Sequence, residues 1–343
     1  MGFQIGYQST LRVGDQPCSA SGVQRIIAHL QAKEGEQAVA KLNAHLGVAF
    51  SSAVAHQFVP MWQIEAALDY LQQHYPSLVA ISSRLSPNWV DDLASLLANF
   101  DNLEQVITAL VNQQLPVAQF ADTVVISHDS FVRIIWINTG RSPLDSLHVQ
   151  FQHSINMMCS VAERLLGEPF LPLEIALVKQ PDADWLQNIR CQNIRSQAPF
   201  YSWTLSRKQL QQPLNGQIDA APLALQKIQD SFAEQVIAAL RQRFPQLPTM
   251  EQMAQCLDVS DRTLRRKLAA GKSRYQNLIY QVRCQHALRQ LVTERADVAS
   301  LAEQMGFNDV SHFRQSFKHW TGFAPGDFMN ALDKECFLPS DNS

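Results

Sequence analysis

The stretch MAQCLDVS followed by DRTLRRKL, residues 253–268, contains a pattern that returns as LAEQMGFN followed by DVSHFRQSF, residues 301–317. In each copy a short helix with Ala on its inner face leads into a tight turn. The turn falls on a residue that accepts a left-handed backbone, Asp258 in the first copy and Gly306 in the second. The sequence therefore predicts the same helix-turn unit twice.

The second helix of each copy has a start signal and one apolar face. Ser260 is the expected N-cap in the first copy, and Asp309 or Asn308 in the second, because these side chains accept hydrogen bonds from free backbone amides. Apolar residues four positions apart share one buried face of a helix. These pairs are Leu264 with Leu268 and Phe313 with Phe317. Two crossed helices with one exposed face are typical of a helix-turn-helix motif, whose second helix enters the major groove of DNA.

The chain between the two copies is basic and helical. The stretch from Arg262 to Arg289 holds eight Arg or Lys residues and no Asp or Glu. Apolar spacing from Arg274 to Thr293 predicts a helix of roughly 20 residues, which is about 30 Å long. Successive major-groove faces on one side of a duplex lie about 34 Å apart. One basic helix is most often a solvated surface, but two units joined by a helix of this length favour DNA as the partner.

These residues resemble the AraC/XylS family of bacterial transcription regulators. The resemblance covers about 85 residues, from Pro248 to Leu332. The motifs that carry it are Ala254 through Ser260, Leu264 with Arg266, Gly271, Arg283 with Ala287, Ala302 with Gly306-Phe307, Phe313 with Phe317, and then Gly322, Pro325 and Phe328. The sequence departs from the family pattern where Asp258 replaces the usual Gly, Phe328 the common Tyr, and Gln315 a frequent Arg.

The resemblance implies which residues contact double-stranded DNA. The expected base contacts are Arg262, Arg265 and Arg266 in the first recognition helix, and Ser311, His312, Arg314 and Gln315 in the second. An Arg can donate two parallel hydrogen bonds to guanine. The expected phosphate contacts, which add affinity without sequence information, are Lys267, Lys272, Arg274 and Lys318. Two roles stay open: Arg283 either contacts DNA or braces the helical core, and His312 either reads a base edge or caps the helix and packs.

Charge is divided unevenly along the chain. Residues 1–240 contain 14 basic and 20 acidic side chains, a net charge of −6, whereas residues 241–343 contain 14 basic and 11 acidic, a net charge of +3. With 343 residues, 46% of them hydrophobic, the chain is long enough for two or three separate cores. An acidic body joined to a basic end leaves contact with DNA to the C-terminal end.

Several function classes lack support in the sequence. Six cysteines, Cys18, Cys159, Cys191, Cys256, Cys284 and Cys336, lack the paired spacing of a zinc or redox motif, so we expect buried thiols in a reducing compartment. No HExxH, GxSxG or phosphate-loop pattern occurs, so we expect no enzyme, metal or cofactor. No apolar run approaches roughly 18 residues and no signal peptide is recognisable, which predicts a cytoplasmic protein with no membrane segment.

The N-terminal sequence predicts an α+β domain, with helices and a small antiparallel sheet. It is followed by an all-α C-terminal domain of two helix-turn-helix motifs joined by a long helix. The predicted helices are 21–33, 36–46, 60–74, 88–99, 101–114, 147–166 and 183–189. The predicted strands are 117–127 and 131–138, separated by a turn at 128–130, and then 173–179 and 198–205.

This N-terminal part is similar, less specifically, to the sensory and dimerisation domain of the regulator subgroup that controls ornithine and arginine use. The order Leu147-His148 opening a helix, Leu173 through Leu177, Gln180-Pro181, and Leu210 through Leu214 carries the similarity. It implies a homodimer and a small-molecule effector. The candidate pocket residues are Arg133, Trp136, His148, Tyr201 and Trp203, with His153 and Glu174 as further polar groups. The alternative for Trp136 and Trp203 is that they pack in the hydrophobic core and do not line a pocket.

The predicted organisation has four parts. Residues 1–215 form the effector-sensing and dimerisation domain, 216–222 a linker, 223–334 the DNA-binding domain with motifs at about 249–270 and 298–319, and 335–343 a polar tail. The predicted function is a sequence-specific transcription regulator that reads two consecutive major grooves per subunit, with RNA polymerase as a possible further partner. The alternative is a basic helical module that docks an acidic protein without reading DNA.

Overall fold

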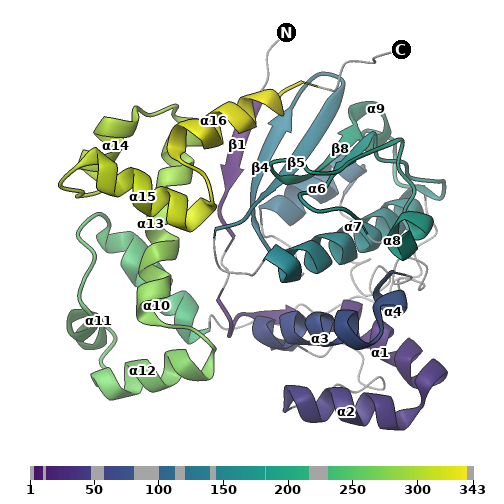
Figure 1. Ribbon diagram of the computed structural model, residues 1–343, viewed down its shortest axis with the longest axis horizontal. Helices are drawn as coiled ribbons and strands as arrows, with labels where there is room; N and C mark the ends of the chain where they lie inside the picture. Colours follow the sequence, from purple (N-terminus) through teal and green to yellow (C-terminus); the bar gives the residue numbers. More distant parts are fainter. Residues whose placement is uncertain are drawn as a thin grey trace. The chain divides into compact units, whose positions relative to one another are not determined.

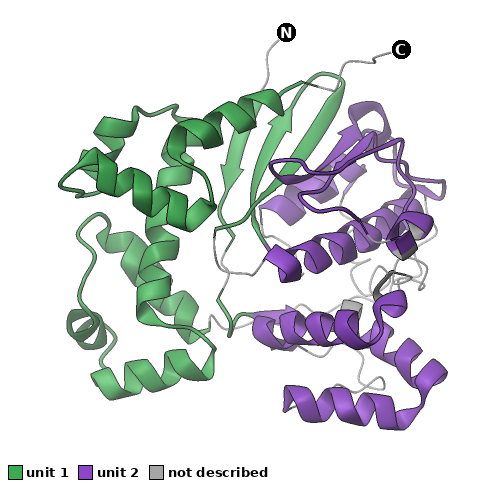
Figure 2. Ribbon diagram, in the orientation of Figure 1, with its two compact units in different colours: residues 1–16, 121–143, 230–343 green, residues 17–120, 144–229 purple. Residues whose placement is uncertain are grey.

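The structure is a computed structural model that describes residues 4–10, 13–47, 58–80, 100–112, 120–139, 144–181, 183–215 and 231–337. The chain forms two compact units, each built from separated parts of the sequence (Figure 2). Unit 1 comprises Met1–Gln16, Ala121–Pro143 and Asp230–Ser343, and unit 2 comprises Pro17–Phe120 and Leu144–Gln229. The predicted helix at 88–99 and the predicted linker at 216–222 lie outside the described residues.

Unit 1 combines three antiparallel strands with the C-terminal helices (Figure 1). Its described elements are β1 (Gln4–Gln8), β4 (Asp122–Ser127), β5 (Phe131–Ile137), α10 (Phe232–Arg243), α11 (Met250–Cys256), α12 (Asp261–Ala270), α13 (Tyr275–Thr293), α14 (Val298–Gln304), α15 (Val310–Thr321) and α16 (Pro325–Lys334). The strands β1, β4 and β5 pair antiparallel in that order. The predicted turn at 128–130 joins β4 to β5, and the His128 amide donates to the Phe131 carbonyl at 2.9 Å.

The helices of unit 1 begin at strong caps and share one core. Ser231 and Glu234 form a capping box at the start of α10, in which the Glu234 amide donates to Ser231 Oγ at 3.2 Å. The core joins apolar side chains from α10, α11, α12 and α13. Val13, which belongs to the N-terminal segment before β2, is fully buried in the same core. The chain start therefore contributes to the core of the C-terminal helices.

Unit 2 contains helices around short strands. Its described elements are β2 (Pro17–Ser19), α1 (Ser21–Glu34), α2 (Glu36–Leu46), β3 (Phe58–Pro60), α3 (Met61–His74), α4 (Pro76–Ala80), α6 (Leu103–Val111), α7 (Leu144–Leu166), β6 (Glu174–Ala176), α8 (Ala183–Asn188), β7 (Asn193–Arg195), β8 (Tyr201–Ser206) and α9 (Arg207–Leu210). The pairs β2–β3 and β6–β8 are antiparallel, but β6 and β7 are parallel. The expectation of a purely antiparallel sheet is wrong at β7, a three-residue strand with too few apolar residues to predict.

The long helix α7 of unit 2 is extensively buried. It spans 23 residues and ends at Gly167, whose φ of 72° suits a residue without a side chain. Its buried residues include the polar side chains His148, Gln150, Gln152 and His153. Burial lowers the pKa of His153 to about 4, because a charged imidazole is poorly solvated there. This helix therefore carries several polar groups inside unit 2.

Candidate nucleic-acid interface

The first helix-turn-helix motif consists of α11 and α12. Thr249 caps α11: its Oγ1 accepts from the Gln252 amide at 3.2 Å, and Gln252 Oε1 accepts from the Thr249 amide at 2.8 Å. Asp258 adopts φ 52°, as the pattern predicted. Ser260 then caps α12 by accepting from the Thr263 amide at 3.2 Å. The predicted turn and the predicted N-cap are confirmed.

The second motif, α14 and α15, repeats this geometry. Gly306 adopts φ 74°, and Asp309 caps α15 by accepting from the His312 amide at 2.7 Å. Of the two predicted caps, Asp309 therefore forms the bond. In both turns an amide bonds to the carbonyl five residues earlier: Val259 to Ala254 and Phe307 to Ala302, each at 3.0 Å. This bond satisfies a carbonyl at the end of the first helix and sets the angle of the second.

The inner faces of the two recognition helices are buried as the spacing predicted. Leu264 and Leu268 are 0% and 2% exposed, and Phe313 and Phe317 are both 0% exposed. The second motif has an aromatic core, in which the Phe313 and Phe307 ring centroids lie 5.4 Å apart at 71°. Edge-to-face contacts of this kind stabilise aromatic cores beyond the burial of their area. The outer face of each helix is thereby oriented away from its own core.

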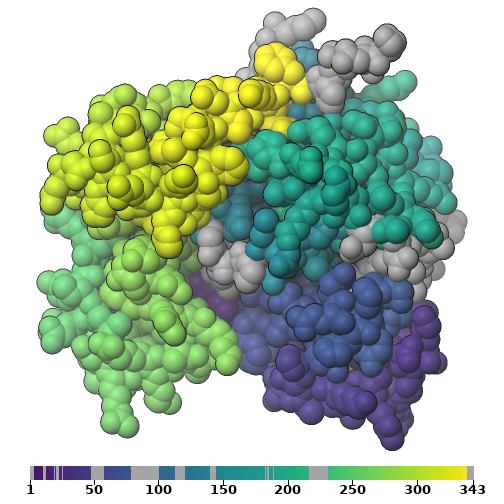
Figure 3. All heavy atoms as spheres, viewed as in Figure 1, coloured from purple at the N-terminus to yellow at the C-terminus, as the bar shows by residue number. Residues whose placement is uncertain are grey.

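The helix α13 connects the two motifs. It packs against α10 on the side of the first motif and against α14 and α15 of the second, and Figure 1 shows it running between them. In Figure 3 the green atoms of the first motif and the yellow atoms of the second lie next to each other. The Arg283 guanidinium of α13 lies 5.6 Å from the centroid of the Phe307 ring. This cation–π contact agrees with the bracing role of Arg283, although through a ring rather than a hydrogen bond.

All eleven predicted DNA-contacting side chains are exposed. In α12 and the turn after it they are Arg262, Arg265, Arg266, Lys267, Lys272 and Arg274, and in α15 they are Ser311, His312, Arg314, Gln315 and Lys318. The Nζ of Lys267 lies 4.5 Å from the Phe232 ring centroid, and the His312 ring meets Phe307 edge-on at 5.4 Å. The two helices therefore present guanidinium, ammonium and amide donors outward, which suits bases and phosphates.

The candidate pocket residues divide between the two units. In unit 2, His148 Nδ1 lies 3.2 Å from the Tyr201 hydroxyl, and burial raises the pKa of Tyr201. Trp203 is buried in the same unit. In unit 1, Trp136 is half-buried and Arg133 is 1% exposed. Within unit 2 the structure therefore joins His148 and Tyr201 directly.

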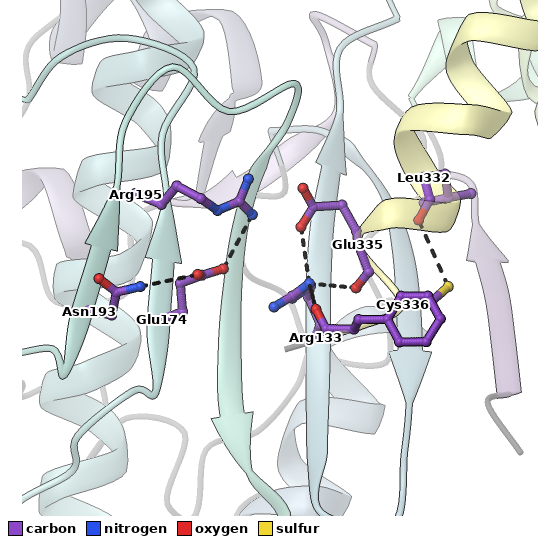
Figure 4. Close-up of polar contacts among 8 residues, drawn as sticks. Arg133, Glu174, Asn193, Arg195, Leu332, Glu335 and Cys336 are labelled. Carbon is purple, nitrogen blue, oxygen red and sulfur yellow. Dashed lines mark hydrogen bonds and ion pairs between the residues drawn. The ribbon is translucent and has the colours of Figure 1, made fainter. Parts of the chain in front are cut away.

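Two buried carboxylates take part in ion pairs that the sequence did not predict. Arg133 Nη1 lies 3.1 Å from Oε2 of Glu335, which follows α16 (Figure 4). Glu335 lies in the stretch predicted as a polar tail, but it is only 3% exposed. In unit 2, Glu174 accepts from Asn193 at 3.3 Å and from Arg195 at 3.2 Å (Figure 4). Such partners lie far apart in sequence, so no local pattern predicts them.

The structure also shows where the cysteines lie and whether the described residues contain a metal-binding group or a membrane-spanning helix. The expectation of buried thiols is correct for Cys18, Cys159, Cys284 and Cys336, but Cys191 is half-buried and Cys256 is exposed on α11. Within the described ranges, no group of three or more His, Cys, Asp or Glu side chains could hold a metal ion. No described helix combines the length and apolar character of a membrane span.

Comparison with known proteins identifies the class of the C-terminal helices. Residues 253–331 match a family model described as a helix-turn-helix domain. The region from α11 to α16 is a helix-turn-helix domain. More particularly, this match agrees with the resemblance of these residues to the helix-turn-helix domain of the AraC type.

Two of these relatives come from Pseudomonas aeruginosa. The Ornithine utilization regulator is 29% identical over 184 residues, which cover 50% of this chain and 54% of that protein. The HTH-type transcriptional regulator VqsM is 26% identical over 111 residues, which cover 30% of this chain and 34% of that protein. The chain thus spans about half the length of the first relative and about a third of the second. The first is a regulator by name and the second a transcriptional regulator, and the alternative of a protein-docking module has no support from them.

A solved structure with wide coverage is that of the transcriptional regulator CdpR from Pseudomonas aeruginosa. It is 17% identical and covers 85% of this chain and 96% of its own, with a TM-score of 0.35. That score is too low for a conclusion about the fold.

Proposed function

We propose that this protein is a sequence-specific, DNA-binding transcription regulator that reads two consecutive major grooves with each subunit. The observation that carries the proposal is the duplicated motif. Two recognition helices with the same turn hydrogen bond and the same kind of cap expose all their predicted contact residues, and one helix packs between them. A basic surface without this repetition would favour nonspecific attraction instead.

The exposed residues divide into two roles. Arg262, Arg265 and Arg266 read bases from α12, and Ser311, His312, Arg314 and Gln315 read them from α15. Lys267, Lys272, Arg274 and Lys318 contact phosphates. Base contacts carry sequence information, whereas phosphate contacts set affinity and its dependence on salt.

The proposal extends to regulation. The N-terminal region, predicted as residues 1–215, dimerises the protein and binds a small molecule, and the buried pair His148 and Tyr201 belongs to the binding site. A dimer lets two half-sites act together, and an effector that prefers one arrangement changes the affinity for DNA. The regulator acts in the cytoplasm, where contact with RNA polymerase accompanies DNA binding. The name of the Ornithine utilization regulator supports a search among amino acids of that kind.

Selection of bound sequences from a random duplex pool tests the proposal. The full chain should recover one motif that spans two major grooves. Arg265→Ala should lose preference at its base position by about 1 to 3 kcal/mol, whereas Lys318→Ala should weaken all sequences alike and reduce the salt dependence. Lys334→Ala, an exposed charge outside both motifs, is the matched control. Equal affinity of the wild type for all sequences would refute specific readout.

A further inference from the structure

The sheet of unit 1 is bonded directly to the DNA-binding helices. Its strand β1 packs along α13, and residues of the hairpin β4–β5 bond to α13 and to the chain after α16. These strands come from residues 1–143, whereas the helices begin after residue 230. The contacts lie within one compact unit.

The first contact is a buried amide on α13. Gln285, 5% exposed, donates from Nε2 to the Thr10 carbonyl at 2.9 Å and to Asp122 Oδ1 at 3.1 Å. Its Oε1 accepts from Arg241 Nη2 of α10 at 2.8 Å. Gln281 adds a bond from Nε2 to the Thr10 carbonyl at 3.2 Å. One side chain thus ties α13 to α10 and to the sheet.

The second contact centres on the carboxylate of Asp122, which accepts the hydrogen bond from the Gln285 amide. Asp122 is 0% exposed and also accepts from the Thr10 amide at 2.6 Å and from the Tyr7 hydroxyl at 2.9 Å. Burial, with the nearby carboxylate, raises the pKa of Tyr7 well above its usual value, so the hydroxyl stays protonated and donates. A buried network in which the members satisfy one another favours a single arrangement of the helices that share it.

Two further contacts hold the ends of the helical region. Arg133 of β5 donates to the Phe337 carbonyl at 3.0 Å and pairs with Glu335, which holds the chain after α16 (Figure 4). At the other end, Asp15 Oδ2 accepts from the Ala233 amide at the start of α10 at 3.1 Å. A Cβ added at Gly271, directly after α12, would lie 2.7 Å from Asp15 Cβ, so the two segments are in close contact.

We propose that residues 4–10 and 13–16, together with the hairpin β4–β5, act as a brace that fixes the two helix-turn-helix motifs relative to each other. The brace bonds to α10 and α13, which pack against the first and second motifs, and to the end of α16. Because the hairpin bonds to α13 and to the chain after α16, a rearrangement of the hairpin changes the spacing of the motifs. Gln285, Asp122 and Arg133 are positioning residues in this proposal, and its consequence for DNA rests on the proposed function.

The test compares two full-length variants of α13. Gln285→Met keeps the length of the side chain and removes the bonds to Thr10 and Asp122, whereas Gln290→Met changes a half-buried Gln outside this network. Hydrogen exchange of α13 should become about tenfold faster in Gln285→Met and stay unchanged in Gln290→Met. If Gln285→Met does not fold, Glu335→Gln replaces it, with exchange read in α16. Equal exchange in wild type and variant would overturn the brace.

The second readout is tolerance of altered spacing. A duplex that the wild type selects is compared with one in which a base pair is inserted between the two contacted grooves. The wild type should bind the longer duplex about tenfold more weakly, and Gln285→Met should lose most of that difference, because its motifs adjust at lower cost. A spacing penalty that is the same in both proteins would overturn the role of the brace in positioning. A wild type without any site preference would instead refute the proposed function, and hydrogen exchange would then decide on the brace alone.

Discussion

The substitution Gly14→Ala tests whether the N-terminal segment belongs to the core of the C-terminal helices. A Cβ at Gly14 would overlap the backbone carbonyl oxygen of Gly271, which no side-chain rotation relieves. Gly14 does not adopt a positive φ, so Ala is permitted at this position by its own backbone. Any loss of stability therefore reports the contact with the chain after α12.

The structure bounds the size of this loss. Overpacking of a well-packed site costs about 1 to 3 kcal/mol. If residues 13–16 leave their place instead, the loss is limited to the burial of Val13, about 1.5 to 3 kcal/mol, and the bond from the Ala233 amide to the Asp15 carboxylate, about 1.5 to 3 kcal/mol. We therefore expect a loss of about 1 to 3 kcal/mol from overpacking, and of no more than about 6 kcal/mol.

Urea unfolding of the full chain measures the effect. Hydrogen exchange of peptides from α10 and α12 follows the unfolding of unit 1 separately from unit 2. A loss of about 2 kcal/mol lowers the midpoint by about 1 M urea when the slope is about 2 kcal/mol per M. Gly6→Ala is the matched control, because a Cβ at Gly6 meets nothing within 4 Å. Equal midpoints for Gly14→Ala, Gly6→Ala and the wild type would refute the packing of this segment in the core.

Two further predictions concern unit 2 and the second motif. Burial lowers the pKa of His153 to about 4 from 6.5, so between these values the unfolded chain binds the proton more strongly and unit 2 loses stability as the pH falls. Between pH 7 and pH 5 unit 2 should lose about 2 kcal/mol of stability, and His153→Leu should abolish this pH dependence. The same pH dependence in wild type and variant would show that His153 is not its source. Asp309→Ala removes the N-cap of α15 and should lower the free energy of unfolding by about 1 kcal/mol in thermal unfolding. Asn308→Ala should have a smaller effect. A larger effect at Asn308 would show that Asp309 is not the cap.

Much of the helix-turn-helix geometry could be predicted because its causes are local. A cap bonds to an amide three residues away, as Ser260 does to Thr263 and Asp309 to His312. The turn depends on a single residue with positive φ, and Asp258 and Gly306 both meet that requirement. Buried faces follow from apolar residues four positions apart. The strands β4 and β5 and the turn between them follow from a short run of β-branched and aromatic residues.

The brace depends on long-range contacts instead, and only the tertiary structure could decide it. Gln285 and Asp122 are 163 residues apart in the chain, and Arg133 and Glu335 are 202 apart. The residues next to a Gln or Glu in the sequence do not show whether its side chain is buried or exposed, because its partner comes from an element far away in the chain. The sequence by itself therefore determined that two DNA-reading motifs would form and which of their faces would be buried. Tertiary packing determined that the chain start and the β4–β5 hairpin join those motifs in one unit, since burial of Val13 and of the Asp122 network requires both ends of the chain to be folded together.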